Sequence, residues 1–389
     1  MFYIANEKDI REGKVTDIYF RRSEQILKKL GKDVTVKAEV FLKNFPNQYR
    51  WGILAVIEET LKLLANGNKV SVRCMPEGTI FTEYEPVMVI EGKYLDFGVF
   101  ETAILGFLCQ SSGIATKAAR CKVAAGQKPV YSFGARRVHP AITPMVERSA
   151  YIGGAEGVST VIGAEAIEGQ PVGTMPHALI LIIGDTVEAT RAFDQVISKD
   201  VNRISLIDTF NDEKFEAINV CRELGDNIYG LRLDTPGSRK GDFVKILQEV
   251  RWELNIRGFK KVKLVVSGGL DEEEIMELGQ AADSFGVGTS ISGARVLDFA
   301  LDIVEIEGIK VAKRGKMSGA KKVIRCSNCF NDKVVLEQEK AENITCQECG
   351  SRFNELFMEV IKDGKLLKDL PSAITIREKV LNQLKHVQL

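Results

Sequence analysis

Apolar residues recur along the chain in two different patterns, and each pattern predicts one part of the fold. Residues 34–40 alternate apolar and polar side chains, as expected for a strand with one face in solvent. Further strands are predicted at residues 70–74 and 86–90, and a helix at residues 51–64, where the apolar side chains form one stripe. Residues 1–112 are therefore predicted to form an α+β domain, an antiparallel sheet with helices on one face.

The middle of the chain changes to a strand–helix rhythm. Two helices are predicted at residues 101–108 and 114–125, separated at Ser112, a favourable N-cap, and Gly113. Strands are predicted after them at residues 129–133, 156–160, 171–174, 203–207, 228–233, 262–266 and 284–287. Most of these strands are separated by amphipathic helices, at residues 186–197, 212–224 and 242–254. Strand candidates with helical spacers predict a parallel (β/α) barrel, complete or open, over residues 113–295.

Two glycine turns follow the last two predicted strands. Gly268 and Gly269 end the first of these strands, and Gly286, Gly288 and Thr289 lie at the end of the second. Glycine turns that lead into helices expose backbone N–H groups, which favour an anion. In (β/α) barrels the loops after the late strands form phosphate sites. The pair of turns therefore predicts a phosphate cradle rather than two ordinary loops.

Polar side chains gather at the C-terminal ends of the other predicted strands, the face on which barrel enzymes carry their active sites. These side chains are Arg136, Arg137, His177, Asp208, Arg232 and Asp234. Arginine binds anionic oxygens bidentately, and two aspartates could hold Mg²⁺ or ribose hydroxyls. Phe133, beside Arg136, offers an apolar surface for a ring. Together these residues predict a substrate with several phosphates and a sugar.

The last part of the chain contains a cysteine motif. Residues 296–325 return to strand-like alternation and are expected to rejoin the first domain, and residues 353–389 are expected to form a C-terminal helical segment. Between them, residues 326–352 hold Cys-x2-Cys, 16 further residues and a second Cys-x2-Cys. This spacing predicts a structural zinc site with four thiolate ligands and no open coordination position for catalysis, in Cys326, Cys329, Cys346 and Cys349. The acidic surface of this ribbon favours a structural or interface role.

The composition of the chain argues against nucleic acid and membranes as partners. Lys and Arg together number 53, as do Asp and Glu, so the net charge gives no general attraction to nucleic acid or to an anionic membrane. The first residues contain no apolar segment of the kind found in signal peptides, and no apolar run approaches the roughly 20 residues of a membrane helix. The four remaining cysteines are scattered. We therefore expect a cytoplasmic protein with neither a membrane nor a nucleic acid as its partner.

Six short motifs, in this order along the chain, resemble those of the shorter, archaeal-type nicotinate phosphoribosyltransferases. The matching segments are Thr16-Asp17-Ile18-Tyr19, Ser112-Gly113-Ile114-Ala115-Thr116, Phe133-Gly134-Ala135-Arg136-Arg137, Gly157-Val158-Ser159-Thr160, Gly173-Thr174-Met175-Pro176-His177, and Asp208-Thr209 with Arg232-Leu233-Asp234. The resemblance covers about residues 1–325. It implies an α/β fold with an irregular or open (β/α) barrel and an α+β sandwich domain built from the N-terminal and post-barrel segments, to which this chain adds the small zinc ribbon.

The resemblance also implies a reaction. Nicotinate attacks the anomeric carbon of phosphoribosyl pyrophosphate, giving nicotinate mononucleotide and pyrophosphate, a step of NAD biosynthesis. The pyridine ring would lie between Phe133 and a Tyr19 supplied by a second subunit, which implies a homodimer with shared active sites or a higher oligomer. Arg136, with Ser159 and Thr160, would recognise the nicotinate carboxylate or position its neighbours.

Further roles follow from the same resemblance. Arg232, Asp234 and the glycine turns would hold the ribose phosphate, and Asp208 would assist with Mg²⁺ or pyrophosphate. His177 corresponds to the histidine that ATP phosphorylates in a ligase-like coupling of hydrolysis to turnover, and imidazole is a competent phosphoryl acceptor. The matching motifs also place Asp17, Arg137 and Thr174 among the substrate-binding residues.

Two alternatives stay open at this point. Quinolinate phosphoribosyltransferase must bind a second carboxylate and release carbon dioxide, and its corresponding motif is rich in Lys, Arg and Thr. Residues 132–140 contain no lysine and no T-R-K-T motif. An alternative from another class is a zinc-ribbon protein whose barrel only binds nucleotides or nucleic acid. The acidic ribbon and the zero net charge count against it.

Overall fold

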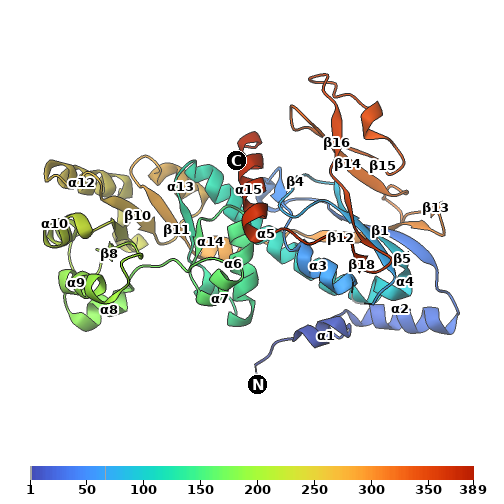
Figure 1. Ribbon diagram of the computed structural model, residues 1–389, viewed down its shortest axis with the longest axis horizontal. Helices are drawn as coiled ribbons and strands as arrows, with labels where there is room; N and C mark the ends of the chain where they lie inside the picture. The colour runs from blue at the N-terminus through green and yellow to red at the C-terminus, as the bar shows by residue number, and fades with distance from the viewer. Residues whose placement is uncertain (1, 66) are drawn as a thin grey trace. The chain divides into compact units, whose positions relative to one another are not determined.

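The computed structural model describes residues 2–65 and 67–389, which form two compact units (Figure 1). The first unit contains the chain up to Thr116 together with Arg295–Gln388, and the second contains Lys117–Ala294 with the terminal Leu389. The first unit is therefore built from both ends of the chain, and the second from its middle.

An antiparallel sheet forms the first unit. Within the described residues it has seven strands, in the order β13-β12-β1-β5-β3-β17-β18. These strands are β1 (Thr35–Leu42), β3 (Val70–Cys74), β5 (Pro86–Lys93), β12 (Phe299–Ile306), β13 (Ile309–Lys310), β17 (Met358–Lys362) and β18 (Lys365–Leu366). The strand that follows the barrel segment, β12, pairs with β1 from the N-terminal segment, with Val40 opposite Leu301. The sheet therefore joins segments about 260 residues apart in the chain.

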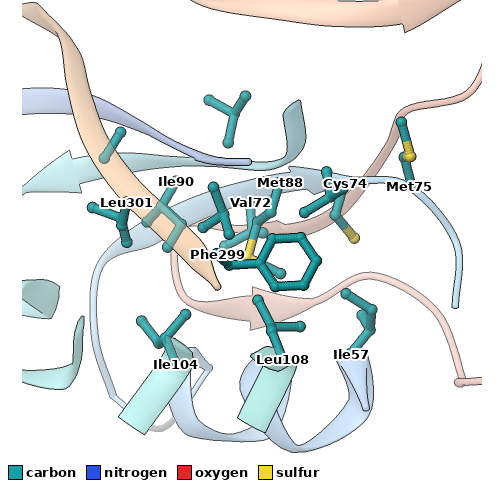
Figure 2. Packing of buried hydrophobic residues seen from close by; sticks show 14 of the residues in the cluster. Ile57, Val72, Cys74, Met75, Met88, Ile90, Ile104, Leu108, Phe299 and Leu301 are labelled. Atoms are coloured by element: carbon teal, nitrogen blue, oxygen red, sulfur yellow. The ribbon is translucent and has the colours of Figure 1, made fainter. Parts of the chain in front are cut away.

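Helices cover one face of this sheet and close its core. They are α1 (Glu7–Arg11), α2 (Ile18–Lys29), α3 (Ile57–Leu64), α4 (Tyr94–Phe97) and the first part of α5 (Glu101–Ala125), whereas α15 (Ala373–Gln383) packs through Ile376 and Val380 against the turn at Gly78. Figure 2 shows Phe299 among strand residues such as Val72 and Met88, facing Ile104 and Leu108 of α5. Full burial of each such side chain stabilises the fold by about 1.5–3 kcal/mol.

The long helix α5 corrects the prediction of two helices separated at residues 111–113. Ser112 is buried, and its Oγ accepts the backbone N–H of Ala55 at 3.0 Å. A Cβ at Gly113 would lie 2.4 Å from the carbonyl oxygen of Arg295, so only glycine lets the two backbones approach this closely. The small residues therefore serve contacts with other segments, and the predicted helix break was wrong because those contacts are not local.

The helical stretch Tyr94–Ala125 is, among the described residues, the one that is long and apolar enough to cross a membrane. Its most apolar window has a mean hydropathy of 1.3, although no such stretch was expected from the sequence. Half of that window is buried inside the protein, and core helices such as α5 have the same composition. We therefore assign this stretch to the core.

The predicted helix at residues 51–64 is shorter in the structure. A short strand, β2 (Gly52–Ile53), pairs with β4 (Ile80–Phe81), and α3 begins only at Ile57. Val56 has a φ of 58°, a left-handed conformation that cannot continue into the helix from its N-terminal side. The apolar stripe over this segment therefore reflects burial of a strand followed by a helix.

A parallel sheet forms the second unit and curls into a half-barrel (Figure 1). In the described part of the chain it has six strands, in the order β7-β6-β11-β10-β9-β8. The strands are β6 (Val130–Ser132), β7 (Gly157–Val158), β8 (Ile204–Leu206), β9 (Gly230–Leu233), β10 (Lys263–Ser267) and β11 (Ser284–Val287). The helices are α6 (Thr143–Ile152), α7 (Val161–Glu165), α8 (His177–Ile183), α9 (Thr186–Val196), α10 (Glu213–Leu224), α11 (Gly237–Lys240), α12 (Phe243–Ile256), α13 (Glu272–Leu278) and α14 (Thr289–Ser292).

One predicted strand does not form. The N–H of Val172 donates to the carbonyl of Val158 at 2.8 Å, but residues 171–174 do not form a strand. A single bond does not make a strand, and β7 and β8 are the two edges of the sheet. The barrel is therefore open, and the predicted fold class, an open (β/α) barrel with an α+β sandwich domain, is confirmed.

A small antiparallel sheet carries the four clustered cysteines. Its order is β15-β14-β16, formed by β14 (Lys321–Cys326), β15 (Asp332–Leu336) and β16 (Phe353–Glu355). Ile324, Val335 and Phe353 form its apolar core together with two of the cysteines. This core is small, so the sheet depends on its cysteines and on its contacts with the rest of the first unit.

Candidate active site

An arginine is held in place at the C-terminal ends of the half-barrel strands. Arg232 of β9 donates from Nε to Ser267 Oγ at 2.9 Å, from Nη1 to Thr174 Oγ1 at 3.1 Å and from Nη2 to Asp234 Oδ2 at 3.0 Å. All three guanidinium nitrogens are therefore engaged, which fixes the direction of the cation. Ser267 also donates to Asp234 Oδ1 at 2.8 Å, so the aspartate is held from both sides.

Two carboxylates lie next to this arginine. Asp208, just after β8, accepts the backbone N–H of Asp234 at 3.2 Å through Oδ2. Its other oxygen, Oδ1, is buried and has no hydrogen-bond partner among the residues that the structure describes. Burial raises the pKa of the Asp208 carboxyl, an effect that His177 opposes and Asp234 reinforces. A buried carboxylate oxygen without a partner suits a cation or a donor group of a ligand.

His177 is the first residue of α8 and faces both carboxylates. Its Nε2 lies 3.8 Å from Asp234 Oδ2 and 4.0 Å from Asp208 Oδ1, and its Nδ1 lies 3.0 Å from Thr209 Oγ1. The side chain is 40% exposed, so a ligand can reach it. Thr209 belongs to the Asp208-Thr209 motif but received no role in the sequence analysis, and the structure places its hydroxyl next to the imidazole.

The two glycine turns lie side by side. β10 and β11 are neighbours, with Ser267 opposite Gly286, so the turns that follow them meet at one edge of the sheet. Gly268 and Gly269 have φ angles of 92° and 70°, a conformation that other residues rarely adopt. Ser290 Oγ donates to the carbonyl of Leu270 at 2.7 Å and thereby joins the second turn to the first.

The remaining cradle residues lie in the second turn. Gly288 follows β11, and Thr289 begins the short helix α14. A Cβ at Gly268 would lie 2.8 Å from Asp234 Oδ1. The first turn therefore touches the carboxylate that also binds Arg232, and the structure brings the predicted phosphate cradle together with Arg232 and Asp234.

Phe133 lies at the end of β6 on the same edge of the sheet. Its ring centroid is 5.7 Å from the Arg232 guanidinium carbon and 6.3 Å from the Tyr131 ring, to which it is nearly parallel. Arg136 and Arg137 follow in a short 3-10 turn and are exposed. The site therefore combines an aromatic surface with two cations that are accessible to solvent.

Ser159 and Thr160 are directed toward the protein interior. Glu147 Oε1 accepts the N–H of Ser159 at 2.8 Å and its hydroxyl at 2.7 Å, and Glu147 Oε2 accepts the N–H of Thr160 at 3.2 Å and its hydroxyl. Glu147 is completely buried. The two hydroxyls predicted to bind substrate are thus occupied by a carboxylate that sequence reasoning missed, since nothing in the pattern of α6 distinguishes it from a surface glutamate.

Substitution of Glu147 tests this network. Glu147→Gln replaces one accepting oxygen by an NH2 group that faces N–H and O–H donors, so the free energy of unfolding should fall by about 3–5 kcal/mol. Urea denaturation followed by circular dichroism measures the change. Glu165→Gln, at an exposed glutamate of α7, is the control and should change stability by less than about 0.5 kcal/mol. Equal effects of both substitutions would contradict the role of Glu147.

Asp17 and Tyr19 belong to the other compact unit. Asp17 Oδ2 accepts the hydroxyl of Thr102 at 3.0 Å, and the N–H of Asp17 donates to Thr102 Oγ1 at 3.0 Å. The Tyr19 hydroxyl lies 3.4 Å from Asp17 Oδ2, and the residue is 56% exposed. Asp17 is therefore fixed at the start of α2 and presents an exposed tyrosine next to it.

The four clustered cysteines are arranged as metal ligands. Their Sγ atoms all lie within 4.8 Å of one another, with 3.4 Å between Cys326 and Cys349 and 3.5 Å between Cys329 and Cys346. These distances are far longer than the roughly 2.05 Å of a disulfide. Four thiolates around one metal ion at about 2.3 Å lie about 3.8 Å apart. The donor set and its spacing therefore fit a metal ion.

A parallel half-barrel joined to an antiparallel unit that both ends of the chain build is the fold of one class of phosphoribosyltransferases. Family models of quinolinate phosphoribosyl transferase match the chain in two consecutive parts, the N-terminal domain at residues 17–112 and the C-terminal domain at residues 114–302. The chain belongs to this family, the type II phosphoribosyltransferases.

Solved structures agree with this placement. The chain is 52% identical to the nicotinate-nucleotide pyrophosphorylase of Pyrococcus furiosus, with a TM-score of 0.97 over 100% of this chain and 99% of that one. Human nicotinic acid phosphoribosyltransferase matches with a TM-score of 0.76 over 96% of this chain and 94% of that one. Its identity is 18%, so this second likeness concerns the fold alone.

Curated relatives include nicotinate phosphoribosyltransferases. One from Mycobacterium tuberculosis is 30% identical over 284 residues, which are 70% of this chain and 59% of the relative. One from Bacillus subtilis is 33% identical over 223 residues, 56% of this chain and 44% of the relative. The chain thus spans less than two thirds of the length of these relatives.

Proposed function

We propose that this protein transfers the phosphoribosyl group of phosphoribosyl pyrophosphate to nicotinate, forming nicotinate mononucleotide and pyrophosphate. The observation that carries this proposal is the fixed Arg232, with Asp208 and Asp234 beside it, next to two glycine turns on adjacent strands. Relatives named for nicotinate or its nucleotide support a pyridine acid as the acceptor.

The chemistry of the site suits this reaction. A ribosyl centre that loses pyrophosphate becomes positively charged, and the carboxylates of Asp208 and Asp234 stabilise such a charge. Arg232 and the backbone N–H groups of the glycine turns bind the phosphate and fix the sugar, so the reacting atoms meet in a defined orientation. Mg²⁺, which prefers carboxylate and phosphate oxygens, would neutralise the pyrophosphate, and Asp208 has an oxygen available for it.

The acceptor would bind on the other side of Arg232. The ring of Phe133 offers a stacking surface for the pyridine. Arg136 and Arg137 are the exposed cations that follow it and would bind the carboxylate, because Glu147 occupies the hydroxyls of Ser159 and Thr160. This assignment differs from the expectation that these two hydroxyls contact the acceptor.

A direct assay tests the proposal. The purified protein is incubated with phosphoribosyl pyrophosphate, Mg²⁺ and one acid at a time, with and without ATP, and mononucleotide is measured by chromatography. We expect product from nicotinate. A second candidate, transfer to quinolinate, is favoured by the family model that the chain matches. Release of carbon dioxide from quinolinate, with no product from nicotinate, would establish that alternative.

We also propose that ATP phosphorylates His177 and that hydrolysis of the phosphohistidine drives turnover. An imidazole nitrogen would form a bond to the γ-phosphorus as ADP leaves, and water would later accept the phosphoryl group. The exposed imidazole between two carboxylates supports this role.

Loss of the imidazole tests the coupling. His177→Ala should abolish the stimulation of transfer by ATP and leave some basal transfer, measured as initial rates with and without ATP. His386→Ala removes an exposed imidazole of the other unit and should leave the stimulation unchanged. ATP stimulation that survives in His177→Ala would contradict the phosphohistidine.

We propose, further, that two copies of the chain share their active sites, with Tyr19 of one copy against the acceptor ring in the other. The exposed apolar residues on α2 and at its C-cap, among them Ile18, Ile26 and Leu30, provide a surface for a second copy. Tyr19→Ala should raise KM for nicotinate about tenfold, because base-stacking contacts of this size contribute about 1–3 kcal/mol.

Mixed dimers test the sharing of sites. Tyr19→Ala is co-refolded with Arg232→Gln, so that half of the random dimers contain one intact site. At nicotinate concentrations well below KM, activity should recover to about a quarter of the wild-type value, as expected for random pairing in a symmetric dimer. Absence of recovery in mixtures that analytical ultracentrifugation shows to be dimeric would contradict shared sites.

For the cysteine cluster we propose zinc as the metal, with a structural role. Four thiolates leave no open position for a substrate, and structural zinc sites have this ligand set. None of the eight cysteines, all of them in the described part of the chain, forms a disulfide in the structure, which suits a reducing compartment, and we propose the cytoplasm.

A further inference from the structure

Gly286 lies directly beneath the ring of Phe133. A Cβ built on Gly286 would be 2.4 Å from Phe133 Cε2 and 2.5 Å from Cδ2, closer than carbon atoms can approach. On its other side it would meet Ser267 Cβ at 3.2 Å. The ring therefore occupies the space that any side chain at position 286 would fill, and the absence of a side chain seats the ring against the sheet.

Sheet register explains why this glycine and this ring meet. β11 and β6 are neighbours, and Gly286 pairs with Tyr131. Phe133 lies two residues after Tyr131 and on the same face, and its N–H donates to the carbonyl of Val287 at 2.8 Å. The backbone of Phe133 is thus fixed to the strand that carries Gly286, and the ring leans over that strand.

The structural reason for glycine differs between the two turns. Gly268 and Gly269 have left-handed backbone conformations, whereas Gly286 does not. A Cβ at Gly288 would meet Phe133 O at 3.5 Å, an ordinary contact. The first turn needs glycine for its backbone shape, which suits a phosphate cradle. Gly286 needs to be glycine because a side chain there would overlap the Phe133 ring, and the tight approach to Ser267 Cβ adds to this restriction.

We propose that Gly286 is a positioning residue for the acceptor and that it acts through Phe133, not a ligand of the ribose phosphate. Its missing side chain sets the height and tilt of the ring on which a flat aromatic acid stacks. This inference rests on the proposed transfer to a pyridine acid. Under this proposal Gly268 and Gly269 serve the phosphate, and Gly286 of β11 serves the acceptor.

Gly286→Ala tests the proposal in kinetics. The added methyl group displaces the ring, so KM for the pyridine acid should rise at least about tenfold, while KM for phosphoribosyl pyrophosphate should change by less than about twofold. Gly106→Ala, at an exposed position of α5 where the new Cβ would meet no described atom within 4 Å beyond its chain neighbours and its own helix backbone, is the matched control and should change neither constant. A rise in KM for phosphoribosyl pyrophosphate alone would overturn the proposal in favour of phosphate binding.

A double-mutant cycle tests the seating of the ring without any assay of activity. Gly286→Ala should lower Tm by about 3–8 °C in the wild-type background, because the methyl group overpacks the ring. In the Phe133→Ala background the same substitution should lower Tm by less than about 1 °C. Additive shifts would overturn the proposal. If no pyridine acid is a substrate, the proposed function fails, and the cycle still decides whether Gly286 seats Phe133.

Discussion

Arg232→Gln should lower kcat/KM for phosphoribosyl transfer by about 100- to 1000-fold, the effect of removing one group that stabilises transition-state charge. The guanidinium spans Thr174, Asp234 and Ser267, and glutamine is too short and has too few donors to reach all three. The substitution also removes the cation that balances Asp234. We therefore expect the loss both in KM for phosphoribosyl pyrophosphate and in kcat, measured by steady-state kinetics with each substrate varied.

A second arginine of the half-barrel provides the control. Arg251 donates to the carbonyl of Val262 and to Asp283 Oδ2, both at 2.7 Å, next to the N-terminal ends of β10 and β11. It too is held by a backbone carbonyl and a carboxylate, but it lies at the edge of the sheet opposite to the predicted active site. Arg251→Gln should change kcat/KM by less than about threefold. Equal losses in the two variants, or a loss below about tenfold in Arg232→Gln, would contradict the role of Arg232.

Lysine at position 232 separates charge from geometry. Arg232→Lys keeps the positive charge but lacks the planar fork that joins three partners. If charge alone binds the phosphate, this variant should recover most of the lost activity. Because the fork also holds Asp234 and Thr174 in place, we expect only partial recovery, with kcat/KM still at least about tenfold below the wild type.

Features determined by nearby residues could be predicted from the sequence. Asp271 followed three residues later by Glu274 is the sequence signature of a capping box, and at the start of α13 these two side chains accept each other's backbone N–H groups. To predict that Arg232, Asp234 and Asp208 lie close together, one further rule was enough: the C-terminal ends of parallel strands meet at one edge of the sheet. The open barrel and the sandwich follow from the same alternation of strands and helices, which is why the fold class could be predicted.

Features that depend on distant partners could not be predicted in the same way. Gly113 resembles a helix break until the carbonyl of Arg295 is seen next to it. Ser159 and Thr160 resemble substrate ligands until Glu147, twelve residues earlier, is seen to accept all four of their donors. The pairing of polar groups depends on the tertiary structure. A sequence can therefore predict where a site lies more readily than which of its polar atoms are available to bind a ligand.

The second large effect is expected at the cysteine cluster, because the sheet that carries the cysteines has a small core. β14, β15 and β16 enclose a core of three apolar residues and two cysteines, too few to keep such a module folded alone. Structural zinc contributes about 10–16 kcal/mol to the folding of isolated zinc-finger peptides. In this protein, ion pairs also stabilise the small sheet. Arg73 binds Glu337 and Glu355, and Lys322 binds Glu355 at 2.8 Å.

Cys346→Ser should therefore remove the bound metal and unfold the ribbon without unfolding the half-barrel. We expect about one zinc per chain in the wild type and none in the variant by elemental analysis, as one complete set of four ligands predicts. Limited proteolysis should then cut the variant within residues 326–355, and amide exchange there should accelerate while β10 and β11 stay protected. Cys109→Ser, at a half-buried cysteine outside the cluster, should keep the metal and the protection. Full zinc content in Cys346→Ser, or a wild type that purifies without zinc, would contradict a structural zinc site. An equal loss of protection in β10 would contradict separate unfolding and show that the ribbon and the half-barrel unfold as one unit.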